Sequence, residues 1–205
     1  YLSGHPLEKY RNIMEKMISA RTIDFQPDDE TGIPKVYDGQ KVIIGGMITE
    51  KTIKYTRNNK VMAFLTVEDL MGTVEIVVFP RDYEKWQTLI NEDARVFIQG
   101  RVNAEDDKPS KLILEKVRAF DDIPREIWIQ FKDREDYAQK EQELLNYLRG
   151  SVGTSAVVIY LKDVKAIKRL PAGYHVQISD FLLEELKKKY GDSNVKVVER
   201  VLKNF

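Results

Sequence analysis

The chain has 205 residues and a mass of 23.9 kDa, so it is long enough for one large domain or two small ones. It carries 33 lysines and arginines against 33 aspartates and glutamates, and this zero net charge argues against a protein that coats nucleic acid by bulk electrostatics. The absence of cysteine excludes disulfide bonds and thiolate metal sites, and without a signal peptide or an apolar run of ~20 residues we expect a cytoplasmic protein rather than a membrane protein.

Residues 1–37 are predicted to form a helical lead-in followed by a linker. Apolar side chains recur three and four residues apart, as on one face of a short amphipathic helix: Leu7, Tyr10, Ile13, Met14, Met17 and Ile18. Pro6 lies near the start of this helix, where a missing backbone N–H costs little. Beyond Phe25, the polar run QPDDETGIP contains proline and glycine and therefore predicts a loop.

Residues 38–122 begin with three predicted strands. The first, KVIIGGMITEKTIKYT, contains Gly45 and Gly46, which predict a bulge or bend within it. A tight hairpin turn follows at Asn58 and Asn59, because asparagine tolerates the left-handed conformation that such turns require. The second and third strands are VMAFLTVED and TVEIVVFP.

A helix and two more strands complete this segment. In RDYEKWQTLI the apolar residues share one helical face: Tyr83, Trp86, Leu89 and Ile90. The strands ARVFIQGRVNAE and SKLILEKVRAF follow, joined by the acidic turn DDKP. Three strands, a helix and two strands are the element order of the OB-fold, a five-stranded Greek-key β-barrel with a helix plugging one end.

Residues 123–205 are predicted to form a separate, small α+β domain. Its elements follow the order β-α-β-β-α-β: EIWIQFK, REDYAQKEQELLNYLRG, SAVVIYLK, the hairpin VKAIKRLPAGYHVQIS, DFLLEELKKKYG and NVKVVERVL. This order predicts a ferredoxin-like fold with a split βαβ unit. We expect a core in which Leu182, Leu183 and Leu186 pack on the first strand, through either Ile127 and Ile129 or Trp128 and Phe131.

Residues suited to catalysis or metal binding are sparse. His5 and His175 lie far apart in different predicted domains, so no transition-metal site is expected. Glu68 and Asp69 are adjacent on a strand and point to opposite faces, so they do not form a paired acid and base. Asp69 is instead expected to accept hydrogen bonds from the backbone of the turn that Gly72 completes. No GxxxxGK(S/T) or GxGxxG motif is present, and we expect neither catalytic residues nor a cofactor.

A cluster of cations is the strongest functional signal. Lysines and arginines lie along the first two strands and at their hairpin tip: Lys51, Lys54, Arg57 and Lys60. Arg101 and Lys111, on the fourth and fifth strands, are expected to reach the same side of the barrel. OB-folds bind oligonucleotides on the face of strands two and three and at the 1–2 and 4–5 loops. With Tyr55 and Phe64 as stacking platforms, the cluster predicts a site for single-stranded nucleic acid.

Two features weigh against this interpretation. Phe64 fits an orientation into the barrel as well as one towards solvent, and the acidic turn AEDDKP would repel a polyanion. Two other functions therefore stay open. One is an OB module that reads RNA, as in tRNA anticodon-binding domains, and the other is a protein-interaction scaffold whose second domain binds a regulatory ligand.

The chain also resembles a known family, the alpha subunit of bacterial replicative DNA polymerase III. The resemblance rests on YLSGHPLEKY, on GGMITEKTIKYTRNNKVMAFLTVEDLMGTVEIVVFPRDYEKW and on FDDIPREIWIQF, and it covers the whole chain. It implies a non-catalytic C-terminal region, with the polymerase domains of the same subunit upstream. The OB domain would bind single-stranded template DNA, with Arg57 and Lys60 at the positions of the family's basic hairpin residues and Lys51 and Lys54 as neighbours.

The same resemblance implies a protein partner for the second domain. In this family the terminal domain docks the tau subunit of the clamp loader and so couples polymerase to loader during DNA replication. The charged final stretch ERVLKNF departs from the family pattern.

Overall fold

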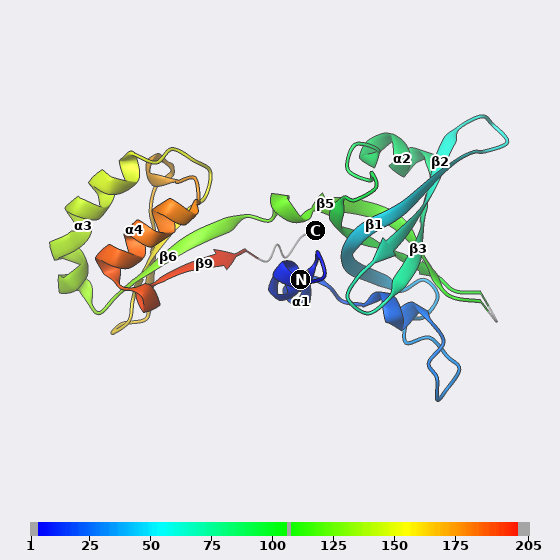
Figure 1. The fold of residues 1–205 in the computed structure, drawn as a ribbon, viewed down its shortest axis with the longest axis horizontal. Coiled ribbons are helices and arrows are strands. Elements are labelled where there is room, and N and C mark those ends of the chain that lie inside the picture. The colour runs from blue at the N-terminus through cyan, green and yellow to red at the C-terminus, as the bar shows by residue number, and fades with distance from the viewer. Residues whose placement is uncertain (1–3, 106–107, 201–205) are drawn as a thin grey trace. The chain divides into compact units, whose positions relative to one another are not determined.

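The computed structural model describes residues 4–105 and 108–200, which form two compact units, one ending at Ile123 and the other spanning Pro124–Arg200 (Figure 1). Residues 106–107 of the predicted acidic turn and the last residues of the final predicted strand lie outside the described residues. Among the described helices, none is long and apolar enough to cross a membrane.

The first unit contains a closed five-stranded barrel, which confirms the predicted OB-fold. Its strands are β1 (Lys41–Tyr55), β2 (Val61–Glu68), β3 (Thr73–Val78), β4 (Arg95–Asn103) and β5 (Lys111–Ala119). They follow the order β1-β2-β3-β5-β4 around the barrel; β3 and β5 are parallel and the other neighbours antiparallel. Helix α2 (Pro80–Trp86) connects β3 to β4 and packs Tyr83 and Trp86 against the barrel core. Pro80 is its first residue, where the fixed φ of proline favours helix initiation.

Strand β1 belongs to both halves of the barrel, because its first half pairs with β4 and its second half with β2. The sequence predicted a bulge or bend at the glycine pair. The register of β1 instead shifts between Ile48 and Glu50, so the bulge lies beyond the glycines. Gly45 and Gly46 meet a different requirement, which is close approach of neighbouring groups. A Cβ on Gly46 would lie 2.4 Å from the carbonyl oxygen of Glu68, so no side chain fits at that corner of the barrel.

The lead-in packs on the outside of the barrel. Helix α1 (Arg11–Met17) lays its apolar face against β1 and β4 and forms a second cluster of buried side chains: Leu7, Ile13, Met14, Met17, Phe97, Phe120 and Ile123. The ring centroids of Phe97 and Phe120 are 4.3 Å apart within this cluster. Further along, Phe25 and Val36 are both buried in the barrel core, so the linker is fastened to the barrel at both of its ends.

The second unit is a four-stranded sheet with two helices packed on one face (Figure 1). Its elements are β6 (Arg125–Phe131), α3 (Arg134–Arg149), β7 (Val157–Leu161), β8 (Ala166–Arg169), α4 (Asp180–Tyr190) and β9 (Val195–Glu199), in the predicted order. The strand order β8-β7-β6-β9 does not agree with a ferredoxin-like arrangement. A split βαβ unit has another strand between its parallel pair, whereas β6 and β7 pair directly. Because β6 occupies the inner edge of β7, β8 turns back at Lys165, with φ of 51°, and pairs with the outer edge of β7.

The core of this unit is formed by alternate residues of its strands, because successive side chains of a strand point to opposite faces of the sheet. Alternate residues of β6 face α3 and α4 and are buried: Ile127, Ile129 and Phe131. Phe131 therefore belongs with the isoleucines, and Trp128 lies on the other face. Ser179 starts α4 by accepting a hydrogen bond from the Leu182 N–H at 3.2 Å, and Gly191, with φ of 97°, ends it. Short 3-10 turns complete the described chain: Glu8–Tyr10, Thr22–Phe25, Phe120–Asp122, Ala172–Tyr174 and Asp192–Asn194.

Candidate nucleic-acid interface

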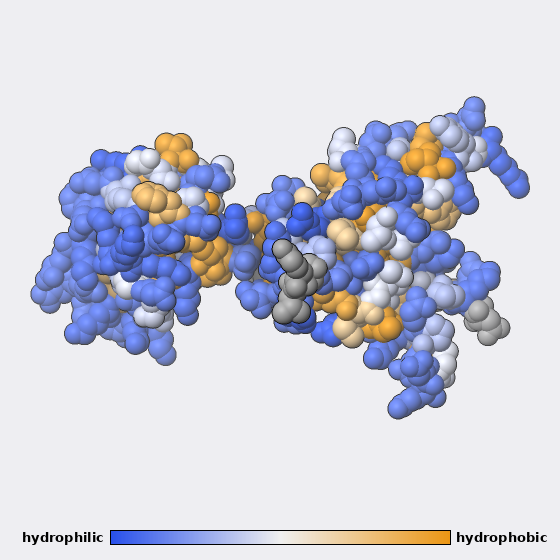
Figure 2. Space-filling view, viewed as in Figure 1, coloured by the Kyte–Doolittle hydropathy of each residue, from blue (hydrophilic) through white to orange (hydrophobic). Residues whose placement is uncertain are grey.

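The hairpin between β1 and β2 projects beyond the barrel (Figure 1). Strand pairing continues as far as Tyr55 and Val61, and a hydrogen-bonded loop closes it. The Thr56 N–H donates to the Lys60 carbonyl and the Asn59 N–H donates to the Thr56 carbonyl, both at 2.9 Å. Asn59 has φ of 58°, the left-handed conformation expected of an asparagine turn. Figure 2 shows hydrophilic residues at this projecting tip and hydrophobic ones nearer the barrel.

Three of the predicted cations at this hairpin have no acidic partner among the residues that the structure describes. Arg57 and Lys60 are exposed on the loop, and within the described part of the chain no carboxylate lies in ion-pair distance of either. Lys54 likewise pairs with no carboxylate among those residues, and its Nζ lies 4.8 Å from the centroid of the Phe64 ring. Cations that are not neutralised within the protein are available to neutralise phosphates.

The two predicted stacking rings lie on opposite faces of the β1–β2 ribbon. Phe64 alternates with the buried Ala63 and Leu65, so its ring is on the outer face of the barrel. Tyr55 pairs with Val61, which lies two residues before the inward-facing Ala63, so both side chains are on the inner face of the ribbon. Tyr55 is 69% exposed because the ribbon has left the barrel at that point. The structure therefore separates the rings that the sequence grouped into one platform.

Lys51 also lies away from the face of Phe64. It pairs with the inward-facing Leu65, and its Nζ donates to Asn91 Oδ1 at 3.2 Å. The same Nζ is 5.4 Å from the centroid of the Tyr83 ring on α2. Lys51 is therefore a neighbour of the barrel-end helix rather than of the predicted phosphate path.

Arg101 and Lys111 lie on the outer face of the barrel, and each is held by a carboxylate. Arg101 Nη2 is 3.4 Å from Glu115 Oε1, and Lys111 Nζ is 2.7 Å from Glu75 Oε1. These ion pairs reduce the attraction of both cations for a polyanion. In the 4–5 loop, Lys108 is also paired with a carboxylate, that of Glu105. The hydrogen bond from Lys108 lowers the pKa of the Glu105 carboxyl.

One row of cross-strand neighbours runs around the outer face. Its members follow each other by strand pairing from β1 through β2, β3, β5 and β4 back to β1: Thr52, Phe64, Val77, Ile113, Arg101 and Lys41. Phe64 and Arg101 are three strand spacings apart, which is ~14 Å at ~4.8 Å per spacing. Lys41 is a candidate contact that sequence reasoning missed, because only the strand register brings it beside Arg101.

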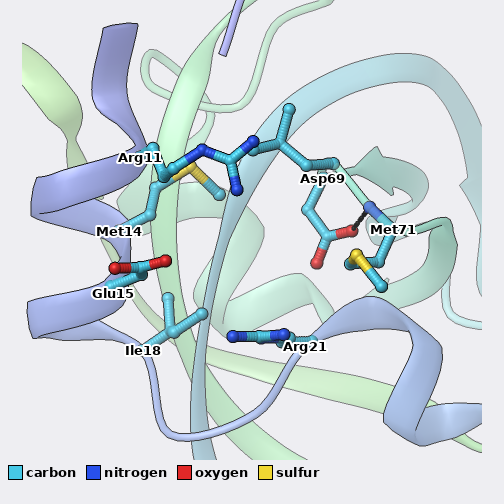
Figure 3. A pocket seen from close by; sticks show the side chains of 8 residues that line it. Arg11, Met14, Glu15, Ile18, Arg21, Asp69 and Met71 are labelled. Carbon is cyan, nitrogen blue, oxygen red and sulfur yellow. Dashed lines mark hydrogen bonds between the residues drawn. The ribbon is translucent and has the colours of Figure 1, made fainter. Parts of the chain in front are cut away.

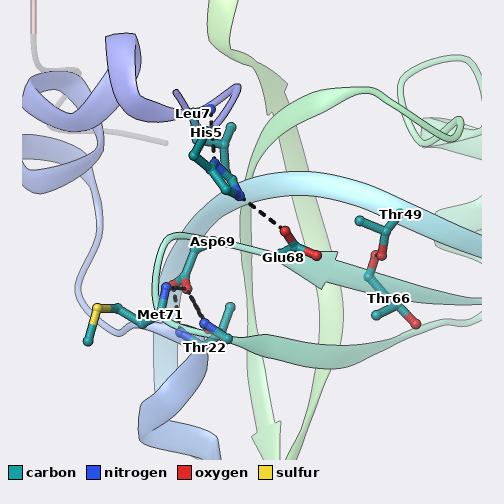
Figure 4. A network of polar contacts seen from close by, with 9 residues as sticks. His5, Leu7, Thr22, Thr49, Thr66, Glu68, Asp69 and Met71 are labelled. Carbon is teal, nitrogen blue, oxygen red and sulfur yellow. Dashed lines mark hydrogen bonds and ion pairs between the residues drawn. The ribbon is translucent and has the colours of Figure 1, made fainter. Parts of the chain in front are cut away.

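A buried carboxylate fastens the lead-in to the turn between β2 and β3 (Figure 4). Asp69 is 6% exposed and accepts hydrogen bonds from the N–H of Met71 at 2.7 Å and of Gly72 at 3.0 Å, which confirms the predicted turn contact. It also accepts from the Thr22 N–H at 2.9 Å and from Thr22 Oγ1 at 2.6 Å. No pattern in the sequence predicted this second contact, which joins segments 47 residues apart.

His5 lies beside this network and makes hydrogen bonds with Leu7 and Glu68 (Figure 4). His5 Nδ1 accepts a hydrogen bond from the Leu7 N–H at 3.2 Å, and its Nε2 lies 3.1 Å from Glu68 Oε1. Within the described residues, no group of three or more histidines, aspartates and glutamates is arranged to hold a metal ion.

A small pocket opens between α1 and the β2–β3 turn (Figure 3). It is lined by apolar side chains together with charged ones: Arg11, Met14, Glu15, Ile18, Arg21, Asp69, Leu70 and Met71. Arg11 is already paired with Glu8 at 2.9 Å. The pocket lies at the opposite end of β2 from the hairpin and contains none of the predicted site residues.

Comparisons with known proteins agree with the fold and with the resemblance seen in the sequence. Residues 42–119 match the family model described as tRNA anti-codon, OB-fold nucleic acid binding domain. Over 96% of its length the chain is 25% identical to the DNA polymerase III subunit alpha of Escherichia coli (strain K12) and 28% identical to that of Halalkalibacterium halodurans. The chain spans 17% of the length of each of these relatives. The predicted resemblance to the alpha subunit is thus confirmed.

Solved structures contribute only a distant likeness. A mitochondrial single-stranded DNA binding protein of S. cerevisiae aligns with 41% of this chain and 96% of its own, at 17% identity and a TM-score of 0.34.

Proposed function

We propose, from the similarity to DNA polymerase III alpha subunits, that this chain is a non-catalytic C-terminal region of such a subunit. In this proposal the barrel binds single-stranded template DNA, and the second unit docks the tau subunit of the clamp loader. The upstream polymerase domains would supply the catalytic chemistry.

The observation that carries the DNA-binding proposal is the projecting hairpin. Arg57 and Lys60 stand at its tip without acidic partners in the described chain, and Lys54 lies over the Phe64 ring on the outer face. A phosphate backbone can follow these cations while a base rests against the aromatic ring at the edge of the β2–β3 face. The electrostatic attraction is local, which is consistent with a chain of zero net charge.

Replacing both tip cations, Arg57→Ala with Lys60→Ala, is expected to weaken binding of labelled oligo-dT roughly tenfold at low salt and to reduce the magnitude of the salt slope by about 1.4, or about 0.7 for each lost phosphate contact. Fluorescence anisotropy at several salt concentrations measures both quantities. The thermal midpoint should not change, because both side chains are exposed and make no ion pair with a described residue.

A matched control removes one arginine and one lysine from the second unit, through Arg134→Ala with Lys162→Ala. Both side chains are exposed, and the net-charge change is identical. The control should leave the affinity and the salt slope near those of the wild-type chain. Equal losses in the two double variants would show a bulk charge effect and count against the hairpin.

RNA is the second candidate ligand, because the matching family model is described by tRNA anti-codon as well as by the OB-fold. Titrating oligo-dT and oligo-rU of the same length in one buffer separates the two. A preference for RNA would indicate recognition of the 2′-hydroxyl and would favour this alternative.

For tau docking we assign the sheet face of the second unit that α3 and α4 leave uncovered. Trp128 and Tyr160 lie on this face with ring centroids 6.5 Å apart, and Ile167, paired with Tyr160, is 55% exposed. Aromatic rings beside an exposed aliphatic residue are typical of the centre of a protein interface.

Ile167→Glu is therefore expected to weaken tau binding about tenfold or more, because it places an unpaired charge in an apolar contact. Isothermal titration calorimetry with purified tau measures the change. Val152→Glu, at a loop residue that is 89% exposed, is the matched control and should bind tau normally. If the Ile167 variant binds tau with wild-type affinity, the uncovered sheet face is not the docking surface.

A further inference from the structure

Two cations and one carboxylate meet on the outer face of the barrel, away from the hairpin. Glu115 Oε2 lies 3.2 Å from Lys41 Nζ, and Glu115 Oε1 lies 3.4 Å from Arg101 Nη2. The side chains of Lys41 and Arg101 are each 56% exposed, whereas that of Glu115 is 29% exposed. The two cations therefore present donors to solvent on either side of a carboxylate that bridges them.

A β-bulge positions this carboxylate. The register between β4 and β5 shifts between Gln99 and Gly100, so Glu115 has no partner on β4. A bulge leaves its extra residue unpaired and redirects its side chain. The free Glu115 carbonyl accepts a hydrogen bond from Trp86 Nε1 at 3.2 Å, and Gly100 admits the close approach, since a Cβ there would lie 2.2 Å from the Ile113 carbonyl oxygen.

We infer that Lys41 and Arg101 form a second phosphate site for single-stranded DNA, and that the Glu115 carboxylate occupies it until a phosphate displaces it. The inference rests on the proposed DNA binding of the barrel. A carboxylate and a phosphate offer similar oxygen acceptors to a guanidinium and an ammonium group, so one can replace the other on the same donors.

The position of the site fits a strand that starts at the hairpin. Arg101 belongs to the same cross-strand row as Phe64, ~14 Å away by three strand spacings. A strand that rests a base on Phe64 and crosses β3 and β5 arrives at the two cations. Exposed ion pairs are weak, so the displacement of Glu115 is a small barrier to this contact.

Displacement has a consequence that salt titration detects. In the wild-type chain the single negative charge of Glu115 neutralises one of the two positive charges, so the cluster has a net charge of +1. In a Glu115→Gln variant the second positive charge also binds a counterion that DNA must release, and this one additional counterion should steepen the salt slope by about 0.7. The affinity at 50 mM salt should rise roughly three- to tenfold.

The test is an oligo-dT titration of the wild-type chain, Glu115→Gln and Glu143→Gln at several salt concentrations. Glu143 pairs with Lys189 at 2.6 Å in the second unit, so its variant makes the same charge change at another ion pair. We expect tighter binding and a steeper slope for the Glu115 variant alone. Adding Lys41→Ala and Arg101→Ala to it should remove both gains, while thermal melting reports any loss of folding.

The outcomes separate this inference from the proposed function. If the Glu115 and Glu143 variants bind alike while the hairpin double variant binds weakly, the second phosphate site is wrong and the DNA-binding proposal stands. If the wild-type chain does not bind oligo-dT even at low salt, both fail. If Glu115→Gln binds more tightly but the gain persists without Lys41 and Arg101, the carboxylate acts only by long-range repulsion and the site is again wrong.

Discussion

Asp69→Ala is expected to lower the free energy of unfolding of the first unit by about 3–5 kcal/mol, because it leaves several buried donors unsatisfied. The carboxylate accepts from the N–H and the hydroxyl of Thr22 and from the N–H groups of Met71 and Gly72 (Figure 4). The alanine side chain can accept none of these hydrogen bonds. The variant should therefore loosen both the β2–β3 turn and the attachment of the lead-in.

Urea denaturation followed by tryptophan fluorescence measures this loss. The chain has two tryptophans, Trp86 in the first unit and Trp128 in the second, so a Trp128→Phe background reports on the first unit alone. Asp69→Asn, which keeps one acceptor oxygen, should fall between the wild-type chain and the alanine variant. An alanine variant within about 1 kcal/mol of wild type would show that water replaces the carboxylate, and would contradict the structural role of Asp69.

The barrel could be predicted from the sequence because each of its local signals agrees with the fold. The asparagine turn and the shared helical face of Tyr83 and Trp86 each describe a short stretch, and each is satisfied within the segment that carries it. Asp69 follows the same rule in part. Its turn contacts are local and were predicted, whereas its contact with Thr22 depends on how the lead-in returns to the barrel.

In the second unit, local sequence signals predicted the elements but not how the strands pair. The order of its helices and strands was predicted, but two sheets with the same element order can differ in which strands pair. The short β8 follows β7 through the turn at Lys165, and the direct pairing of β6 with β7 leaves only the outer edge of β7 for it. A single sequence gives element order far more directly than strand pairing, so the ferredoxin-like prediction failed at that step.

Prediction of the candidate site failed for the same reason, because strand register decides which of its side chains lie together. Residue type singled out Tyr55 and Phe64, but strand parity puts them on opposite faces. Lys41 and Glu115 escaped notice because one is an isolated cation at a strand start and the other an acid among apolar residues. Only the β1–β4 pairing and the bulge in β5 bring them together with Arg101.

The second unit contains one buried acid, Glu126, which is 4% exposed on the sheet face opposite the helices. Arg169 Nη1 lies 2.5 Å from its Oε1, and Trp128 Nε1 donates to its Oε2 at 3.0 Å. Burial pushes the pKa of this carboxyl upwards, but the hydrogen bonds from Arg169 and Trp128, with the charges of Arg169 and Arg200, outweigh it and hold the pKa below its ordinary value of 4.5. The folded unit thus favours the charged form.

Glu126→Gln should therefore destabilise the second unit by about 2 kcal/mol at pH 7, where an amide replaces a charged acceptor of two hydrogen bonds. A lowered pKa makes the contribution of Glu126 complete above 4.5, and the contribution is lost as the pH falls through the lower folded value. The difference between wild type and variant should accordingly shrink from pH 5 towards pH 3. Urea denaturation at each pH, read from Trp128 in a Trp86→Phe background, measures it. A difference that stays constant across this range would show that protonation of Glu126 does not change the stability of the unit, and would contradict the stabilising role of its charge.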